Sequence, residues 1–211
     1  MHFHIVRKKA KAFSLVELMA VVGVMALLAV VAAPALRGLA GTGGRKQAVG
    51  QIMGAFELAR NTALATGTNA AVAIPDSTFT RTNYSYRSLA VVAWNPTNPS
   101  AAPTMVGGWI SLPEGVAIFP NSVSPLPKSN VTVVLPPTQS NTSAQPVIVF
   151  QADGGLVESS AGVFPATNGL AIFEGKVSGS TADRQGRTNR VETITLSPYT
   201  GRARGTLRAA P

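Results

Sequence analysis

Few residues in this sequence are of types that do chemistry. The 211 residues contain no cysteine, and the two histidines, His2 and His4, lie at the start of the chain. The rest of the chain therefore lacks the residues for Cys–His or Ser–His–Asp catalysis and for His-ligated zinc or iron. We interpret His2 and His4 as incidental rather than metal-binding. This inventory predicts a protein that is not an enzyme and that carries no metal and no cofactor.

Carboxylates are sparse, and most of them have a structural explanation. Asp153 opens the turn of a hairpin predicted for "QADGGLVE". Three others, Glu158, Glu174 and Glu192, lie on predicted strands, where we expect them to be solvated or paired with arginines. No calcium-loop pattern occurs.

One carboxylate needs a different explanation. Glu17 lies just inside the apolar part of "RKKAKAFSLVELMAVVGVMALLAVVAAPAL", which runs from Arg7 to Leu36. Leu18 to Leu36 carries no charge, and as a helix it would span roughly 28 Å, close to the ~30 Å hydrocarbon core of a bilayer. A carboxylate in lipid costs on the order of 2.5–3.5 kcal/mol at mid-bilayer and less near an interface, so Glu17 needs a cation. No Lys or Arg lies between Phe13 and Leu36 to supply one.

The basic residues before this run predict an orientation. They contribute to a net charge of +9 and comprise Arg7, Lys8, Lys9 and Lys11. By the positive-inside rule they keep the N-terminus in the cytoplasm. Because no second run of this length exists, we expect the chain to cross the membrane once and to place everything after Arg37 on the far side.

The residues alone leave three interpretations of this stretch open. The first is an uncleaved signal anchor, with Glu17 tolerated near the interface. The second is a conventional signal peptide that releases a secreted β-rich protein. For it, "APA" at Ala33–Ala35 offers small residues before a cut at Leu36, although the apolar run exceeds the usual ~7–15 residues. The third interpretation uses every residue of the stretch and is a family resemblance.

The segment "KAFSLVELMAVVGVMALLAVVAAPAL" resembles the N-terminus of type IV pilins and type II secretion pseudopilins. That family has a short basic leader, a cut before an aromatic residue, and an acid at the fifth mature position of an apolar helix. The resemblance implies that prepilin peptidase cuts between Ala12 and Phe13, that Phe13 is N-methylated, and that Glu17 is the fifth mature residue. The family prefers Gly before the cut, where this chain has Ala12. Pro34 falls where the family often has a helix-kinking proline.

The resemblance also implies a function. The subunit would be structural, and the new amine of a neighbouring copy would be the counter-ion of Glu17 and set the register between subunits. The implied partners are prepilin peptidase, other pilins or pseudopilins, an inner-membrane assembly platform and membrane lipid. The implied location is the inner membrane, single-pass, with the N-terminus cytoplasmic and the C-terminal domain periplasmic. A DNA-uptake or adhesive minor pilin is the alternative.

Arginines near the C-terminus bear on that alternative. The cluster comprises Arg184, Arg187, Arg190, Arg202, Arg204 and Arg208. Tyr199 is the only aromatic residue among them, so a stacking platform for nucleic acid is not evident. We therefore interpret the cluster as solvated, and nucleic acid is not the favoured partner.

After the leader, the first part of the chain, up to Gly67, is predicted to be helical. Pro34 and "GLAGTGG" at Gly38–Gly44 are two weak points of the first helix. From Arg45 to Thr66, apolar residues recur on one face of a helical period, ending at a Gly67 cap. This face comprises Val49, Ile52, Phe56, Ala59 and Ala63.

Short β-like runs separated by turn residues follow from Thr68 onward. The expected strands are Asn69–Ile74, Tyr84–Trp94, Trp109–Leu112, Val116–Phe119, Val131–Leu135, Val147–Gln151, Leu156–Glu158, Leu170–Glu174, Val191–Ser197 and Arg202–Leu207. The expected surface loops are Asn95–Pro103, Pro136–Pro146 and Ser178–Asn189.

Two further stretches narrow the resemblance. "MGAFELARNTALATGTNAAVAI" and "RVETITLSPYTGRARGTL" resemble minor pseudopilins of the general secretion pathway protein H kind. The fold expected is α+β, with a long N-terminal transmembrane helix packed as a spine on an antiparallel β-sheet domain. The expected parts are a leader (1–12), a transmembrane or filament-core helix (13–36), a flexible break and amphipathic helix (37–66), and a β-rich globular domain (67–211).

Overall fold

The structure is a computed structural model of the single chain, and it describes residues 14–98, 101–120, 144–157, 169–184 and 190–209. The chain divides into two units, one up to Ala40 and one from Gly41 onward. The predicted leader, with Ala12 and Phe13, lies outside the described residues, and so does the predicted strand Val131–Leu135. Each unit is described by itself below.

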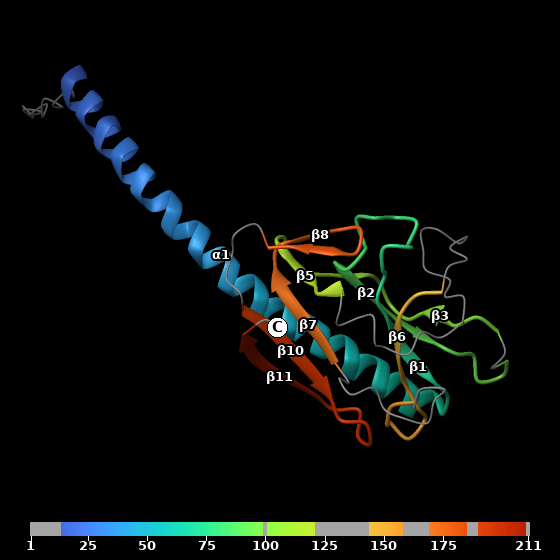
Figure 1. Cartoon of the computed structure of the whole chain (residues 1–211). Helices are drawn as coiled ribbons and strands as arrows, with labels where there is room; N and C mark the ends of the chain where they lie inside the picture. Colours follow the sequence, from blue (N-terminus) through green and yellow to red (C-terminus); the bar gives the residue numbers. More distant parts are fainter. Residues whose placement is uncertain (1–13, 99–100, 121–143, 158–168, 185–189, 210–211) are drawn as a thin grey trace, which may run out of the picture. The chain divides into compact units, whose positions relative to one another are not determined.

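Helix α1 spans Leu15–Thr66 (Figure 1). The helical assignment continues through Pro34 and through Gly38–Gly44, where the sequence suggested weak points. A kink at Pro34 and an opening of the glycine-rich segment stay predictions. Within the described part of the chain, no helix has the length and apolarity needed to cross a membrane, so the membrane-crossing part of the prediction is not confirmed.

The second half of α1 is amphipathic, as its sequence period predicts. Ile52, Phe56, Ala59 and Ala63 are fully buried. The helix ends where Gly67, with φ 64°, donates its backbone N–H to the carbonyl of Ala63 at 3.0 Å. Glycine adopts this left-handed conformation without a steric penalty, which explains why it closes the helix.

Two antiparallel sheets form the body of the second unit. The five-stranded sheet has the order β3-β2-β1-β6, with β4 paired to β2. Its strands are β1 (Ala70–Ala73), β2 (Ser88–Ala93), β3 (Thr104–Met105), β4 (Ile110–Ser111) and β6 (Val147–Phe150).

The four-stranded sheet has the order β11-β10-β7-β5. Its strands are β5 (Val116–Ile118), β7 (Gly169–Glu174), β10 (Arg190–Leu196) and β11 (Ala203–Ala209). A separate hairpin pairs β8 (Lys176–Ser178) with β9 (Thr181–Asp183). Every pairing in these sheets is antiparallel.

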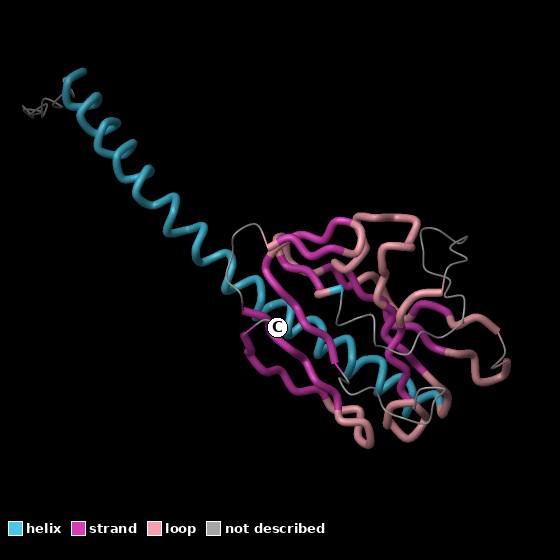
Figure 2. The backbone as a smooth tube through the Cα atoms, viewed as in Figure 1, coloured by secondary structure: helices cyan, strands magenta, loops and turns pink. Residues whose placement is uncertain are grey.

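The main core lies between the second half of α1 and both sheets (Figures 1 and 2). Phe56 of the helix contacts Phe150 of β6, with ring centroids 6.3 Å apart, while Leu170 and Ile194 enter the core from the other sheet. A smaller cluster on β7 and β10, around Phe173, packs against the β8–β9 hairpin. The α+β prediction, a helix packed on antiparallel sheets, is therefore confirmed.

One loop prediction was wrong, and one short strand was not predicted. The start of the predicted loop Ser178–Asn189 belongs to the β8–β9 hairpin, and Thr104–Met105 adds a strand that no prediction included. The strands of the β8–β9 hairpin are short and largely polar, so they lack the alternation of apolar and polar residues that identifies a strand. The hairpin turn at Asp153 is confirmed, because the Asp153 carboxylate accepts a hydrogen bond from the backbone N–H of Gly155 at 2.8 Å.

Candidate assembly site

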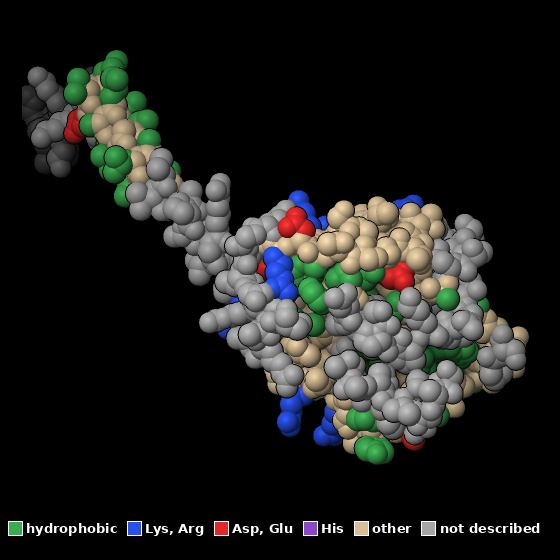
Figure 3. Space-filling model, viewed as in Figure 1, with side chains coloured by type: hydrophobic (Ala, Val, Ile, Leu, Met, Phe, Trp, Pro, Cys, Tyr) green, Lys and Arg blue, Asp and Glu red, His purple; other side chains and the backbone are tan. Residues whose placement is uncertain are grey.

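Glu17 lies in the first turn of α1, on a helix surface that is otherwise apolar. In the space-filling view, apolar side chains gather over these first turns around one acidic group (Figure 3). The large apolar side chains are 48 to 75% exposed. They are Leu15, Val16, Leu18, Met19, Val21, Val22, Val24, Met25, Leu27 and Leu28.

This arrangement suits association rather than catalysis. Ten large apolar side chains in contact with solvent are unfavourable for a chain in isolation, because apolar surface gains roughly 25 cal/mol per Å² on removal from water. Glu17 has no ion-pair partner among the described residues. In the first turn its charge is favourably placed for the helix dipole, which contributes only about 0.3–1 kcal/mol. A buried Glu17 would therefore need a cation from elsewhere.

In the second unit, a buried ion pair fastens the helix to β7. Arg45 Nε lies 3.2 Å from Glu174 Oε1, and the two side chains are 10% and 11% exposed. Neither atom forms a hydrogen bond of good geometry, so the contact is an ion pair without hydrogen-bond alignment. Glu174 is thus paired with an arginine, one of the two environments expected for it.

A second contact joins the helix to two turns. Arg60 Nε donates a 2.7 Å hydrogen bond to the backbone carbonyl of Thr200. The turn that follows Asp153 is joined to the same 197–202 turn, because Leu156 donates its N–H to the Pro198 carbonyl at 2.8 Å. Local sequence patterns do not reveal this contact, because the partner of Arg60 lies 140 residues further along the chain.

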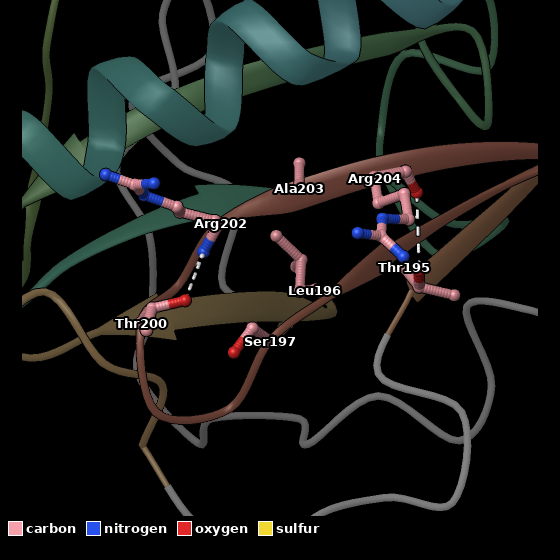
Figure 4. A pocket seen from close by; sticks show the side chains of 7 residues that line it. All are labelled: Thr195, Leu196, Ser197, Thr200, Arg202, Ala203 and Arg204. Carbon is pink, nitrogen blue, oxygen red and sulfur yellow. Dashed lines mark hydrogen bonds between the residues drawn. The ribbon is translucent and has the colours of Figure 1, made fainter.

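The β10–β11 hairpin carries a shallow groove (Figure 4). Thr195, Leu196, Ser197, Thr200, Arg202, Ala203 and Arg204 line it. Arg202 and Arg204 are exposed, and no carboxylate among the described residues pairs with either. Arg184 behaves differently, because its guanidinium lies 5.6 Å from the centre of the Phe119 ring. The predicted cluster of solvated arginines is therefore divided, and Arg187 lies outside the described residues.

Two protein-family profiles match this chain. The profile described as prokaryotic N-terminal methylation motif matches residues 7–33, a range that includes Glu17. The profile described as type II transport protein GspH matches residues 48–178, which is more than half of the chain. The chain belongs to the type II transport protein GspH family. No curated protein and no solved structure matches it.

Membership in the GspH family makes the protein a structural, non-enzymatic pseudopilin with a prepilin methylation motif. The family implies processing by prepilin peptidase and partners in pilus assembly, and its motif indicates a pseudopilin anchored in the inner membrane. The GspH match begins at Ala48 in α1 and ends at Ser178 in β8. It therefore covers most of the helix–sheet core but stops before the β10–β11 hairpin.

Proposed function

We propose that this pseudopilin is cut between Ala12 and Phe13, N-methylated at Phe13, and built into a type II secretion filament. Glu17 of one copy would then pair with the Phe13 amine of a neighbouring subunit. The observation that carries the proposal is the single carboxylate in the first turn of an exposed apolar helix, within the range of the methylation motif.

The pairing follows from charge and symmetry. Each processed copy would contribute one cation, at Phe13, and one anion, at Glu17. When the acid of one copy meets the amine of the next, the contact is head-to-tail, and head-to-tail contacts that do not close a ring generate open filaments. A misaligned neighbour would leave both charges unpaired in apolar surroundings, which is costly. The pair would thus select one axial offset between subunits.

The proposed location is the inner membrane, crossed once, with the N-terminus cytoplasmic and the C-terminal domain periplasmic. Arg7 to Lys11 precede the apolar run, and this basic flank supports that orientation. The proposed partners are prepilin peptidase, other pseudopilins, the inner-membrane assembly platform and lipid.

Mass spectrometry of the mature N-terminus tests the processing step. We expect N-methylated Phe13 as the first residue of protein from cells that contain prepilin peptidase, and intact chain from cells that lack it. A first residue of Leu36 would overturn the proposal in favour of a signal peptide. An Ala12→Gly variant is the matched control, because it restores the preferred residue and should be cut at the same bond.

Glu17→Gln and Glu17→Ala test the register step. Both should be cut normally, because the scissile bond is untouched, but both should co-assemble poorly with other pseudopilins in co-purification or in cross-linking between introduced cysteines. Val22→Ala is the control, since it shortens an exposed apolar residue of the same helix without removing a charge. Wild-type levels of incorporation for Glu17→Gln would contradict the role of the ion pair.

A further inference from the structure

Among the described residues, no strand pairs with the outer edge of the last strand of the four-stranded sheet, and this edge is called the free edge below. β11 pairs with β10 over seven residue pairs and forms the end of the strand order. Arg204, Gly205 and Thr206 are consecutive exposed residues on it. A long unpaired edge is a template for another strand, so proteins usually cover it or protect it with charge.

The register shows which backbone groups face that edge. Ser197 donates its N–H to the Arg202 carbonyl at 2.9 Å and accepts the N–H of Gly201 at 2.8 Å, so this position of the ladder is hydrogen-bonded. Hydrogen-bonded and non-hydrogen-bonded pairs alternate along an antiparallel ladder. The pair of Thr195 with Arg204 is therefore hydrogen-bonded as well, and the backbone N–H and C=O groups of Ala203 and Gly205 point away from β10. Both a donor and an acceptor are thus presented at each of these positions.

Two cations accompany the free edge. Arg202 and Arg204 are exposed and have no acidic partner in the part of the chain that the structure describes. Figure 4 shows their side chains extending in different directions from the hairpin, on either side of Ala203. Tyr199, at the tip of the same hairpin, is 82% exposed. Arginine and tyrosine are the residue types that interfaces favour.

We propose that β11 binds an extended acidic segment of another protein subunit by strand addition. An antiparallel strand placed at this edge would exchange hydrogen bonds with Ala203 and Gly205. Its residue opposite Arg204 would then form a non-hydrogen-bonded pair, in which Cα atoms are about 4.5 Å apart and side chains are closest. A carboxylate at this position, and others on the same face of the added strand, would meet Arg204, and a carboxylate beyond the start of β11 would meet Arg202 in the turn.

The chemistry of the edge favours a peptide over a nucleic acid. The edge offers backbone donors and acceptors in alternation, and a peptide satisfies both kinds. A phosphate backbone only accepts, and Tyr199 alone does not make a stacking platform for bases. The proposal concerns a hairpin outside the matched family range and does not depend on the role of Glu17. If peptide binding at β11 is disproved, the proposed pairing of Glu17 with Phe13 is unaffected, and the reverse also holds.

Peptide binding to the full chain in detergent micelles tests the inference by fluorescence anisotropy. The probe is a labelled peptide in which Glu alternates with Thr. One control peptide has Gln in place of Glu, a second has the same charge with its Glu residues adjacent, and a third is N-methylated at alternate backbone positions. A single-stranded DNA oligonucleotide of equal charge is the fourth probe. We expect the alternating peptide to bind more tightly than all four.

Two matched pairs of variants locate the site. Gly205→Pro removes the N–H at the free edge while leaving the β10 ladder intact, and Gly205→Ala adds a Cβ but keeps the N–H. We expect Pro to abolish binding and Ala to preserve it. Arg202→Gln together with Arg204→Gln should weaken binding roughly five- to tenfold, the sum of two exposed ion pairs, whereas exposed Arg81→Gln should have no effect.

Several results would overturn the inference. They are no binding of the alternating peptide, equal binding of all equally charged probes, tighter binding of the oligonucleotide, and loss of binding for Gly205→Ala to the same degree as for Gly205→Pro. Circular dichroism and thermal unfolding of each variant establish that it is folded. If Gly205→Pro is unfolded, the N-methylated peptide still tests whether the backbone donors of the added strand are needed.

Discussion

At the scale of single residues, two glycines with the same backbone conformation have different surroundings. Gly201 has φ 63° and Gly179 has φ 57°, and both values lie in the left-handed region that favours glycine. A Cβ at Gly201 would collide with the carbonyl oxygen of Gly154 and press on the Phe150 ring. A Cβ at Gly179 would meet nothing within 4 Å. Comparing alanine substitutions at Gly201 and Gly179 therefore separates the free-energy cost of the left-handed backbone conformation from that of the steric clash.

Gly201→Ala should therefore destabilise the protein more than Gly179→Ala. The left-handed conformation costs each variant about 1–2 kcal/mol. Gly201→Ala adds displacement of a backbone carbonyl in a tightly packed turn, so we expect a clearly larger loss in chemical unfolding monitored by circular dichroism. Equal losses of unfolding free energy for the two variants would show that the 197–202 turn can accommodate a Cβ at Gly201 without further destabilisation.

The Arg45–Glu174 pair makes a second prediction at this scale. Arg45→Met leaves Glu174 as an unpaired buried charge and should cost about 3–5 kcal/mol of unfolding free energy. Replacing both residues, as Arg45→Met with Glu174→Leu, should recover most of that loss, because apolar pairs often replace buried ion pairs without penalty. A double-mutant cycle measures the coupling. Additive effects of the two single changes would contradict a direct interaction.

Residue roles were predictable from sequence only where the cause is local. The turn role of Asp153 and the cap at Gly67 follow from neighbours in the chain, and both are confirmed. The partners of Arg45 and Arg60 could not be predicted, because each contact joins the first helix to a strand or turn far along the sequence. Local patterns carry no information about which distant groups the tertiary fold brings together.

At the scale of elements, the helix between Arg45 and Thr66 depends on one face. Phe56 is fully buried in the core to which both sheets contribute, whereas Leu58, two residues later on the opposite side, is 43% exposed. Most of the stability of a helix in a protein comes from packing of such a face rather than from intrinsic propensity. Changes to the two sides should therefore differ widely in cost.

Phe56→Ala should lower the unfolding free energy by about 3–5 kcal/mol, the usual cost of removing a buried aromatic ring and leaving a cavity. Leu58→Ala is the control, and it should change the unfolding free energy by about 0.5 kcal/mol or less, since surface substitutions rarely do more. Urea titration followed by circular dichroism compares them. Similar losses for both variants would contradict the burial pattern.

Among the strands, those with buried apolar runs could be predicted from the sequence, and short polar ones could not. The β1 strand is a buried run next to a helix cap, and its existence and place follow from the sequence. β8 and β9 could not be found in this way, because Thr, Ser, Lys and Asp dominate them and only Val177 and Ala182 pack on the core. Their pairing is stabilised by the sheet beneath them rather than by their own sequence.

At the scale of the whole molecule, the two units differ in what holds them together. The unit from Gly41 onward has its own apolar core, whereas the described large side chains of the first unit are exposed. We expect residues 41–211, expressed alone, to unfold cooperatively and to stay in solution without detergent. The full chain should need detergent or lipid. Aggregation of the 41–211 fragment in sedimentation experiments would contradict the independence of this unit.

The packing of the first helix against the last described strand has a consequence for synthesis. Val49 of α1 lies beside Gly205 of β11, and Arg60 holds the turn that leads into that strand. Because β11 is the last described strand, the part of the helix surface around Val49 stays uncovered until nearly the whole chain has been made. Contacts this distant in sequence slow folding and expose apolar surface meanwhile. A nonsense mutation that stops translation just before Ala203 would therefore leave a nearly complete polypeptide without a closed fold, and proteases would be expected to remove it.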